Sequence, residues 1–305
     1  MHLYEQIKSH FIIPDAYSDW SDYRNHLTRM IIESTNQVSL PLSFHQGMTD
    51  RDLLPTLLIL GAGACNDLNL ADLSPHFSHI TLLDEDSDAM QHALLQYDLT
   101  GDSHITCECT SLTGITEQDY MEFCDELSFF LAEHNDDITP MSFCRHAVSL
   151  VKQTLSNITY TDILEQSSYD HVCCFGVHSQ LLAMYSYIFH AFDVNLRNGL
   201  FRNTDASVCD NATALYMQTL KEWNDTLIPQ INTQILECAR QTAWFGLEIK
   251  RSTDSSPLTI EGARQAISDL QTRHLAITSH TAVWPFCPED HLLYDMWIAR
   301  VNLQA

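Results

Sequence analysis

The chain has 305 residues, 45% of them apolar, and 40 acidic against 15 basic side chains, which leaves a formal net charge of −25. This balance argues against nucleic acid and anionic membrane surfaces as partners, because both are bound through lysine and arginine. No stretch approaches the roughly 20 apolar residues of a membrane span. The composition indicates a globular protein with a sizeable core, whose ligand is a cationic or neutral small molecule.

Ten cysteines raise the question of disulfides or a metal site. The first residues contain no basic segment followed by a long apolar run, so we expect a reducing cytoplasm and free thiols. Cys107 with Cys109 and Cys173 with Cys174 lack the C-x-x-C spacing of zinc ligands. We therefore expect no metal site.

The first fifty residues are predicted to be helical. Residues 3–12 and 20–35 place apolar side chains at intervals of three to four, as an amphipathic helix does. We interpret residues 1–50 as an N-terminal helical cap on the domain that follows.

An alternation of strands and helices begins after this cap. Continuous apolar residues at 57–60 predict a buried strand, and the stretch 64–77 predicts a helix that ends before Pro75. A second strand at 79–86, a helix at 87–97 capped by Ser87 or Asp88, and a third strand at 103–112 follow.

The remaining segments continue the alternation. We expect helices at 116–165 interrupted by Pro140, a fourth strand at 169–179 that stops at Gly176, and a helix at 212–241 broken near Pro229. A fifth strand at 242–252, a helix that opens at Thr259, and two last strands separated by residues 284–290 complete the chain. The pattern predicts a doubly wound α/β sheet in one domain, 51–305, with a helical insertion near 116–165.

The most informative motif joins the first two strands of this domain. Gly61 and Gly63 follow the first strand, where glycine lets the backbone turn and lets a ligand come close. Asp84 ends the second strand, in the position from which a carboxylate binds both ribose hydroxyls. Together these residues predict a nucleotide site.

The same motif distinguishes between two kinds of nucleotide. A dinucleotide places its pyrophosphate on the helix N-terminus, but here Asn66 replaces the third glycine of G-x-G-x-x-G and Asp67 adds a negative charge. S-adenosylmethionine carries a cationic sulfonium and amino group instead. The residues therefore favour a methyl donor over NAD.

The segments "LILGAGACNDLNL", "ITLLDEDSDAM" and "YDHVCCFGVHSQLL" resemble the glycine loop, acidic second strand and fourth strand of the class I S-adenosylmethionine-dependent methyltransferases. The resemblance spans residues 53–180 and implies a Rossmann-like sheet with a reversed last strand. It also implies a donor site whose parts contact the methionine moiety, the ribose and the adenine. These positions fall on Gly61, Ala62 and Gly63, on Asp84 followed by Glu85, on Ser111 and Leu112, and on the loop that starts at Gly176.

The chain departs from the family pattern at two positions. An acid that many members carry two residues before the first glycine is Ile59 here, and the adenine-side acid is Ser111. We hypothesise that Asp67 replaces the first of these and binds the ammonium group of the donor.

The chemistry beyond donor binding depends on the acceptor, which we expect to be a small molecule. Methyl transfer is an in-line displacement, and a base is needed only where the acceptor loses a proton. His178, after the fourth strand, is the candidate base. We expect the acceptor pocket to be built by the N-terminal helices, residues 121–145 and residues 191–211, with Arg197 and Arg202 available to bind a carboxylate.

Two other functions remain open. One is a catalytically inactive protein of this fold that binds a partner through its acidic surface, since Ile59 and Ser111 replace expected acids. The other is an NAD-dependent oxidoreductase, which the two glycines and Asp84 would also permit. The oligomeric state is open as well.

Overall fold

The structure is a computed structural model that describes residues 3–9, 12–35, 50–134, 137–158, 164, 166–252 and 261–303. Its centre is a seven-stranded sheet in the order β3-β2-β1-β4-β5-β7-β6. The strands are β1 (Thr56–Leu60), β2 (His79–Asp84), β3 (Ile105–Cys109), β4 (Tyr169–Phe175), β5 (Ala239–Arg251), β6 (Ala276–Cys287) and β7 (Leu292–Asn302). β7 is antiparallel to β5 and β6, and the other neighbours are parallel. The predicted α/β sheet with a reversed last strand is confirmed.

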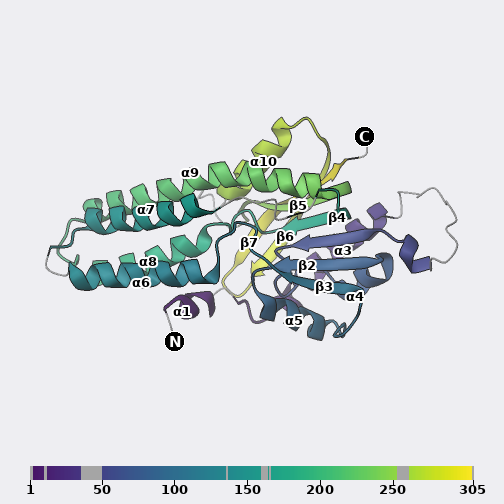
Figure 1. Cartoon of the computed structure of the whole chain (residues 1–305), viewed down its shortest axis with the longest axis horizontal. Coiled ribbons are helices and arrows are strands. Elements are labelled where there is room, and N and C mark those ends of the chain that lie inside the picture. The colour runs from purple at the N-terminus through teal and green to yellow at the C-terminus, as the bar shows by residue number, and fades with distance from the viewer. Residues whose placement is uncertain are drawn as a thin grey trace.

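Helices cover both faces of this sheet (Figure 1). The first face carries α2 (Ala16–Asp19), α3 (Ser21–Thr35), α4 (Leu70–Leu73) and α5 (Ser87–Gln96), and the second carries α10 (Glu261–Thr272) and the C-terminal half of α9 (Ala206–Cys238). Successive residues of a strand point to opposite faces, so Leu57 and Ile59 lie in one core and Leu58 and Leu60 in the other. The continuous apolar run of β1 follows from this burial on both sides.

A separate group of helices projects from one side of the sheet (Figure 1). It consists of α6 (Glu117–Glu133), α7 (Pro140–Asn157), α8 (Ala183–Asn198) and the N-terminal half of α9, around a core of their own side chains. Short α1 (Leu3–Ser9) packs against α6 and α8. The predicted helical insertion corresponds to α6 and α7, with Pro140 at the start of α7. The sequence analysis did not identify α8. Among the described residues no helix is both long and apolar enough to cross a membrane.

The expected break of the long helix near Pro229 is wrong, because α9 continues through this residue from Ala206 to Cys238. Ile228 and Ile231, on either side of the proline, are buried against the sheet, and Leu227 is buried in the core of the projecting helices, so tertiary packing holds the helix together. The carbonyl of Pro229 accepts hydrogen bonds from Thr233 Oγ1 and from a neighbouring arginine, both at 2.8 Å.

Two further expectations are corrected around the glycine motif. The helix predicted within residues 64–77 is reduced to the four residues of α4 and a 3-10 turn, Ser74–His76. Asn69 causes the late start, since its side chain accepts from Asp72 N and caps α4. The cap of α5 is Asp86, which accepts from Ala89 N at 2.9 Å, rather than Ser87 or Asp88.

Two remaining expectations concern the cysteines and the start of α10. All ten cysteines belong to the described residues, and each is a free thiol. Thr259, the expected start of α10, lies outside the described residues, and α10 is described from residue 261.

Candidate functional site

The glycine motif forms a tight turn at the carboxyl end of β1. Gly61 has a φ of +64°, and a β-carbon there would overlap the side chain of Val177. The amides of Gly61 and Ala62 donate to Leu83 O at 2.9 and 3.2 Å, which ties the turn to the end of β2. The close approach of the chain after β4 thus explains the first glycine.

Asp84 connects this turn to the second strand. Its Oδ2 accepts from Gly63 N at 2.8 Å and its Oδ1 accepts from Asp86 N at 2.8 Å. Burial raises the pKa of Asp84, and the hydrogen bonds from these backbone amides oppose the shift. Each carboxylate oxygen keeps a lone pair for a further donor, as ribose binding requires.

The segment after Gly63, residues 64–69, is a folded loop fixed by side chains from other elements. The hydroxyl of Tyr97 lies 3.0 Å from the carbonyls of Cys65 and Leu68 and donates to them. Tyr17 packs edge-on against Tyr97 with ring centroids 5.6 Å apart. The loop is therefore a formed structure, and it presents no helix N-terminus immediately after the glycines.

A buried arginine and a partly buried aspartate meet beside this loop. Arg24 of α3 is 5% exposed, lies 4.4 Å above the ring of Tyr17, and donates from Nη1 to Asn66 O at 3.3 Å. Desolvation and the charge of Glu248 raise the pKa of Asp67 to about 7, while Arg24 opposes the shift. The sequence analysis selected Asp67 but missed Arg24 and Glu248.

A small cavity lies between the glycine loop and the ends of β1 and β4. Ile59, Asp67 and Phe175 are among the residues that line it, and its volume of ≈ 10 Å³ is room for about one water molecule. Any larger ligand at this position requires a shift of the surrounding side chains.

Four aromatic residues, which we call the aromatic cover, close this region from the side of the N-terminal helices. They are Trp20, Tyr23, Trp284 and Phe286. The ring of Trp284 lies 4.9 Å from that of Trp20 and 6.2 Å from that of Tyr23, measured between centroids. Trp20 Nε1 also donates to Phe286 O at 3.2 Å. The cover joins α2 and α3 to β6.

The expected adenine side of the site lies along α1 and the loop after β3. Ser111 Oγ is 3.1 Å from Thr113 Oγ1, and Leu112 is partly buried. Desolvation and the charge of Asp84 raise the pKa of Glu85 to about 7, although the side chain is exposed. Lys8 of α1 lies 3.2 Å from Asp86 and 3.8 Å from a carboxylate of α6. The N-terminal helix thus contacts this edge of the site.

Gly176 and His178 follow β4 but face different sides of the sheet. Gly176 has a φ of +67°, and a β-carbon there would lie 3.3 Å from the ring of Trp284. His178 is fully buried, and its Nε2 lies 2.8 Å from Oδ1 of Asn232 in α9. Its ring is 6.0 Å from that of Phe245, on the second face. Burial lowers the pKa of His178 to about 4, so the ring is neutral at physiological pH.

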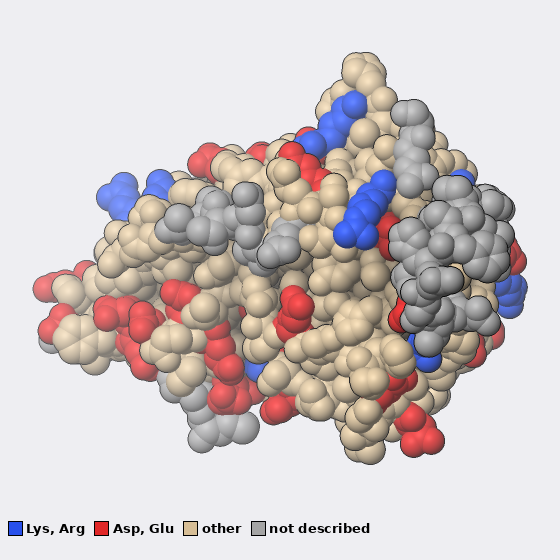
Figure 2. Space-filling view, turned by 45° about the vertical axis from the view of Figure 1, so that its right-hand side comes forward, with Lys and Arg blue, Asp and Glu red and all other residues tan. Residues whose placement is uncertain are grey.

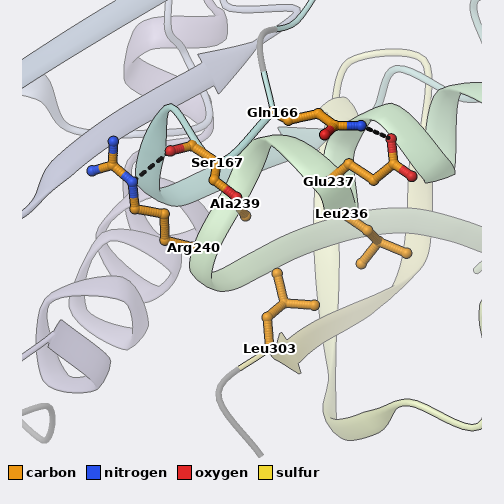
Figure 3. Close-up of a pocket in the computed structure, with 7 residues that line it drawn as sticks. All are labelled: Gln166, Ser167, Leu236, Glu237, Ala239, Arg240 and Leu303. Atoms are coloured by element: carbon orange, nitrogen blue, oxygen red, sulfur yellow. Dashed lines mark hydrogen bonds between the residues drawn. The ribbon is translucent and has the colours of Figure 1, made fainter.

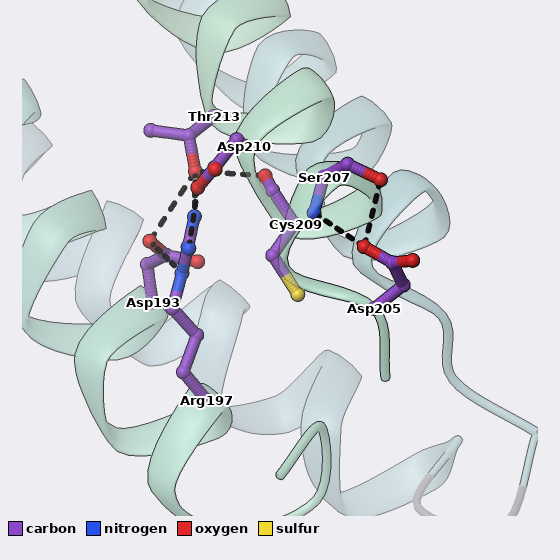
Figure 4. A network of polar contacts seen from close by, with 7 residues as sticks. All are labelled: Asp193, Arg197, Asp205, Ser207, Cys209, Asp210 and Thr213. Atoms are coloured by element: carbon purple, nitrogen blue, oxygen red, sulfur yellow. Dashed lines mark hydrogen bonds and ion pairs between the residues drawn. The ribbon is translucent and has the colours of Figure 1, made fainter. Parts of the chain in front are cut away.

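The expected acceptor pocket is only partly supported by the arrangement of the helices. The N-terminal helices lie over the glycine loop, but residues 121–145 and 191–211 belong mainly to the projecting bundle, where Phe192 and Phe201 are part of its core. Arg197 is held there by Asp193 at 2.8 Å and Asp210 at 2.7 Å (Figure 4). Because both anions already pair with it, the expectation that Arg197 binds a substrate carboxylate is wrong.

The strand order decides the fold. An antiparallel β7 inserted between β5 and β6 produces the reversed final hairpin, and the glycine turn and Asp84 meet at the carboxyl ends of β1 and β2. The fold is that of the class I S-adenosylmethionine-dependent methyltransferases. Open α/β sheets bind their ligands outside the carboxyl ends of the strands.

Comparisons with solved structures found proteins of similar architecture. The N-methyltransferase NodS from Bradyrhizobium japonicum WM9, in complex with S-adenosyl-l-homocysteine, is 12% identical, with 99% of this chain and 98% of that chain covered and a TM-score of 0.46. Magnesium protoporphyrin IX methyltransferase from Synechocystis PCC 6803 is 9% identical over 95% and 85%, with a TM-score of 0.41. A SAM-dependent methyltransferase from Aquifex aeolicus is 8% identical over 99% and 100%, with a TM-score of 0.43. No protein-family model and no curated protein matches the chain.

A second hollow, of ≈ 410 Å³, lies at the opposite end of the seven-stranded sheet (Figure 3). Ser167 precedes β4, Ala239 begins β5 and Leu303 follows β7, so the hollow faces the amino ends of the parallel strands. Its side chains are partly paired with one another, as in the hydrogen bond from Gln166 to Glu237. It is separate from the glycine loop.

Charged side chains are unevenly distributed over the surface (Figure 2). Helix α6 carries six acidic and no basic residues, and five of the acids are exposed: Glu117, Glu122, Asp125, Glu126 and Glu133. Among the described residues, no group of three or more His, Cys, Asp or Glu side chains is arranged to hold a metal ion.

Proposed function

We propose that the protein is an S-adenosylmethionine-dependent methyltransferase that acts on a small molecule. One observation carries the choice of donor: residues 64–69 form a loop, so the glycine turn is not followed by a helix that could bind a pyrophosphate. The reversed β7 is a second argument against an NAD-dependent oxidoreductase, whose sheet is usually all parallel.

The charges beside the loop match the amino-acid end of the donor. In this proposal Asp67 binds the ammonium group and Arg24 binds the carboxylate, because Asp67 belongs to the loop after Gly63, Arg24 donates to Asn66 O of the same loop, and the two side chains carry opposite charges. Arg24 Nε has no hydrogen-bond partner among the described residues, which leaves a donor for the ligand. The acid missing at Ile59 is thereby replaced.

The remaining contacts follow from the geometry of the strand ends. Asp84 binds the ribose hydroxyls, and Glu85, Ser111 and Leu112 border the adenine. Gly63, where a β-carbon would meet only Asp84 Oδ2 at 4.0 Å, lets the ligand approach the backbone, and Gly61, Ala62 and Gly176 border the site. The cavity of ≈ 10 Å³ is too small for the donor, so the side chains around it shift when the donor binds.

The N-terminal helical cap, residues 1–50, has a defined part in this proposal. It carries Trp20, Tyr23 and Arg24, which close the donor site over the glycine loop. His178, which the sequence offered as the base, is buried on the other face of the sheet and bonded to Asn232, so it has a structural part in this proposal. We propose no nucleic-acid or membrane partner.

Calorimetric titration of Arg24→Gln with two ligands tests the assignment. S-adenosylhomocysteine contains the amino-acid end, whereas methylthioadenosine lacks it. We expect Arg24→Gln to weaken the binding of S-adenosylhomocysteine about tenfold or more, as loss of a charge-assisted bond does, and to leave the binding of methylthioadenosine unchanged. Arg29→Gln, on the exposed side of the same helix, is the matched control. Equal loss for both ligands would contradict the assignment of Arg24, and failure of the wild-type protein to bind either would overturn the proposed function.

A further inference from the structure

Glu248 is a buried carboxylate that the donor site does not use. It is 2% exposed and lies near the carboxyl end of β5, on the face covered by α3. A β-bulge follows it directly, since the register against β7 shifts between Glu248 and Lys250. The bulge comes after Glu248, and the strand pairs regularly from Trp244 to Glu248, so the side chains of both residues point to the same buried face.

This carboxylate lies next to the chain segment that follows β4. Phe175 pairs with Gly246, so Glu248 is two residues beyond the last pair. A β-carbon on Gly176 would lie 4.0 Å from Glu248 Oε1, and Ser179 Oγ donates to the same oxygen at 2.6 Å. Glu248 therefore borders the part of the site where the donor and a second substrate meet.

Several polar atoms at this place lack partners. Glu248 Oε2, the Tyr23 hydroxyl and Trp284 Nε1 are buried, and none has a hydrogen-bond partner among the described residues. Their side chains are 2%, 5% and 5% exposed. Buried polar groups without partners are rare in proteins, so the unpartnered oxygen of the buried Glu248 carboxylate indicates a ligand that donates to it.

The surroundings of Glu248 select the kind of ligand. No lysine or arginine of the described chain forms an ion pair with it, and burial raises the pKa of its carboxyl group. The ring of Trp284 borders the same backbone position, Gly176, as Glu248 Oε1, and Tyr23 packs against Trp284. Aromatic rings attract cations. A cation would compensate the buried negative charge and contact the rings at the same time.

We propose that the methyl acceptor is an amine, whose nitrogen is bound by Glu248 beside the rings of Trp284 and Tyr23. This inference rests on the proposed function and names the substrate class of that site. The protonated amine first gives a proton to the Glu248 carboxylate. The lone pair of the neutral nitrogen then attacks the methyl carbon, the carbon–sulfur bond breaks, and its electron pair stays on sulfur as a thioether. The methylated ammonium product leaves, and Glu248 returns its proton to solvent.

Binding of benzylamine and benzyl alcohol to the complex with S-adenosylhomocysteine tests this proposal. The two probes have similar shape and differ in charge at pH 7, and tryptophan fluorescence reports their binding. We expect the wild-type protein to bind benzylamine at least tenfold more tightly than benzyl alcohol, as expected for a hydrogen bond to a charged group. Glu248→Gln should bind benzylamine and benzyl alcohol equally. The dissociation constant of this variant for S-adenosylhomocysteine should stay within threefold of the wild-type value. Glu222→Gln, an exposed glutamate of α9, is the matched control and should keep the preference.

The outcomes separate this proposal from the one on which it rests. If S-adenosylhomocysteine binds but the wild-type protein does not prefer benzylamine, or if Glu248→Gln keeps the preference, the amine proposal is overturned and the donor site stands. If S-adenosylhomocysteine does not bind to the wild-type protein, the proposed function falls and the amine proposal with it. The wild-type comparison of the two probes does not depend on the folding of any variant.

Discussion

Replacement of Asp84 by asparagine should weaken donor binding, because one of the two acceptor oxygens is lost. In the structure Oδ2 accepts from Gly63 N and Oδ1 from Asp86 N, each at 2.8 Å, and each oxygen keeps a second lone pair. An amide retains only one acceptor oxygen. Its NH₂ group must therefore face a backbone N–H, and the ribose hydroxyl on that side loses its acceptor.

The expected size follows from the bonds that are lost. A hydrogen bond to a charged group contributes about 1.5 to 3 kcal/mol, which corresponds to a loss of affinity of about 10- to 150-fold. S-adenosylhomocysteine and methylthioadenosine both contain the ribose, so Asp84→Asn should weaken both by the same factor in calorimetric titrations.

Asp88→Asn is the control, since Asp88 is exposed on α5 and should leave both dissociation constants unchanged. Circular dichroism checks that Asp84→Asn keeps its secondary structure. If its dissociation constants stay within twofold of wild type in a folded protein, or if only S-adenosylhomocysteine is affected, the ribose assignment of Asp84 is refuted.

Three other predictions concern residues around the loop and β4. Because the pKa of Asp67 is raised to about 7, S-adenosylhomocysteine should bind more tightly as the pH rises from about 6 to about 8 and the carboxyl group ionises. Asp67→Asn should remove this pH dependence in calorimetric titrations. If the variant keeps the pH profile of the wild type, the result would argue against a contact between Asp67 and the ammonium group. Tyr97→Phe should lower the unfolding free energy in urea by about 0.5 to 1.5 kcal/mol and weaken donor binding a few fold, because the hydroxyl that fixes the loop is gone. Unaltered stability would contradict the bond from the Tyr97 hydroxyl to Cys65 O. His178→Ala should cost about 2 to 4 kcal/mol of stability and leave donor affinity unchanged. The pKa of His178 is lowered to about 4, so the stability that its neutral ring contributes is complete above pH 6.5 and is lost as the pH falls toward 4. Urea denaturation at each pH should therefore show that the unfolding free energy of the wild type falls more steeply with falling pH than that of His178→Ala. Equal pH dependence of the two proteins would count against a buried neutral ring.

The sheet was predictable because its signals are local. Strands such as β1 and β4 are buried on both faces, and this burial imposes the continuous apolar runs that the sequence shows at Leu57–Leu60 and at 172–175. The helix α8 was missed although Tyr185, Ile188, Phe189 and Phe192 have the spacing of a buried face. That spacing was present in the sequence and could have identified it.

The errors near glycine and proline residues have a common physical cause. Residues 64–69 contain helix-compatible spacing, but Tyr97 and Arg24, distant in the sequence, stabilise a loop there instead. At Pro229 the buried apolar neighbours hold the helix together against the local preference of the residue. In both places tertiary contacts outweigh propensity.

The site was only partly predictable for the same reason. Gly61, Gly63 and Asp84 follow from strand ends, which the sequence marks clearly. Arg24 and Glu248 are ordinary polar residues in their own segments, and each becomes a buried charge only through packing against segments distant in the sequence. An acid within the apolar stretch of β5 was the available signal for Glu248.

Calorimetric titration of the wild-type protein with S-adenosylmethionine, S-adenosylhomocysteine and NADH tests the central claim most directly. The proposed function predicts micromolar dissociation constants for both sulfur ligands, about −8 kcal/mol of binding free energy, and no binding of NADH. Binding of NADH alone would favour an oxidoreductase. Absence of binding to either sulfur ligand would contradict the methyltransferase assignment and leave a protein of this fold without its donor.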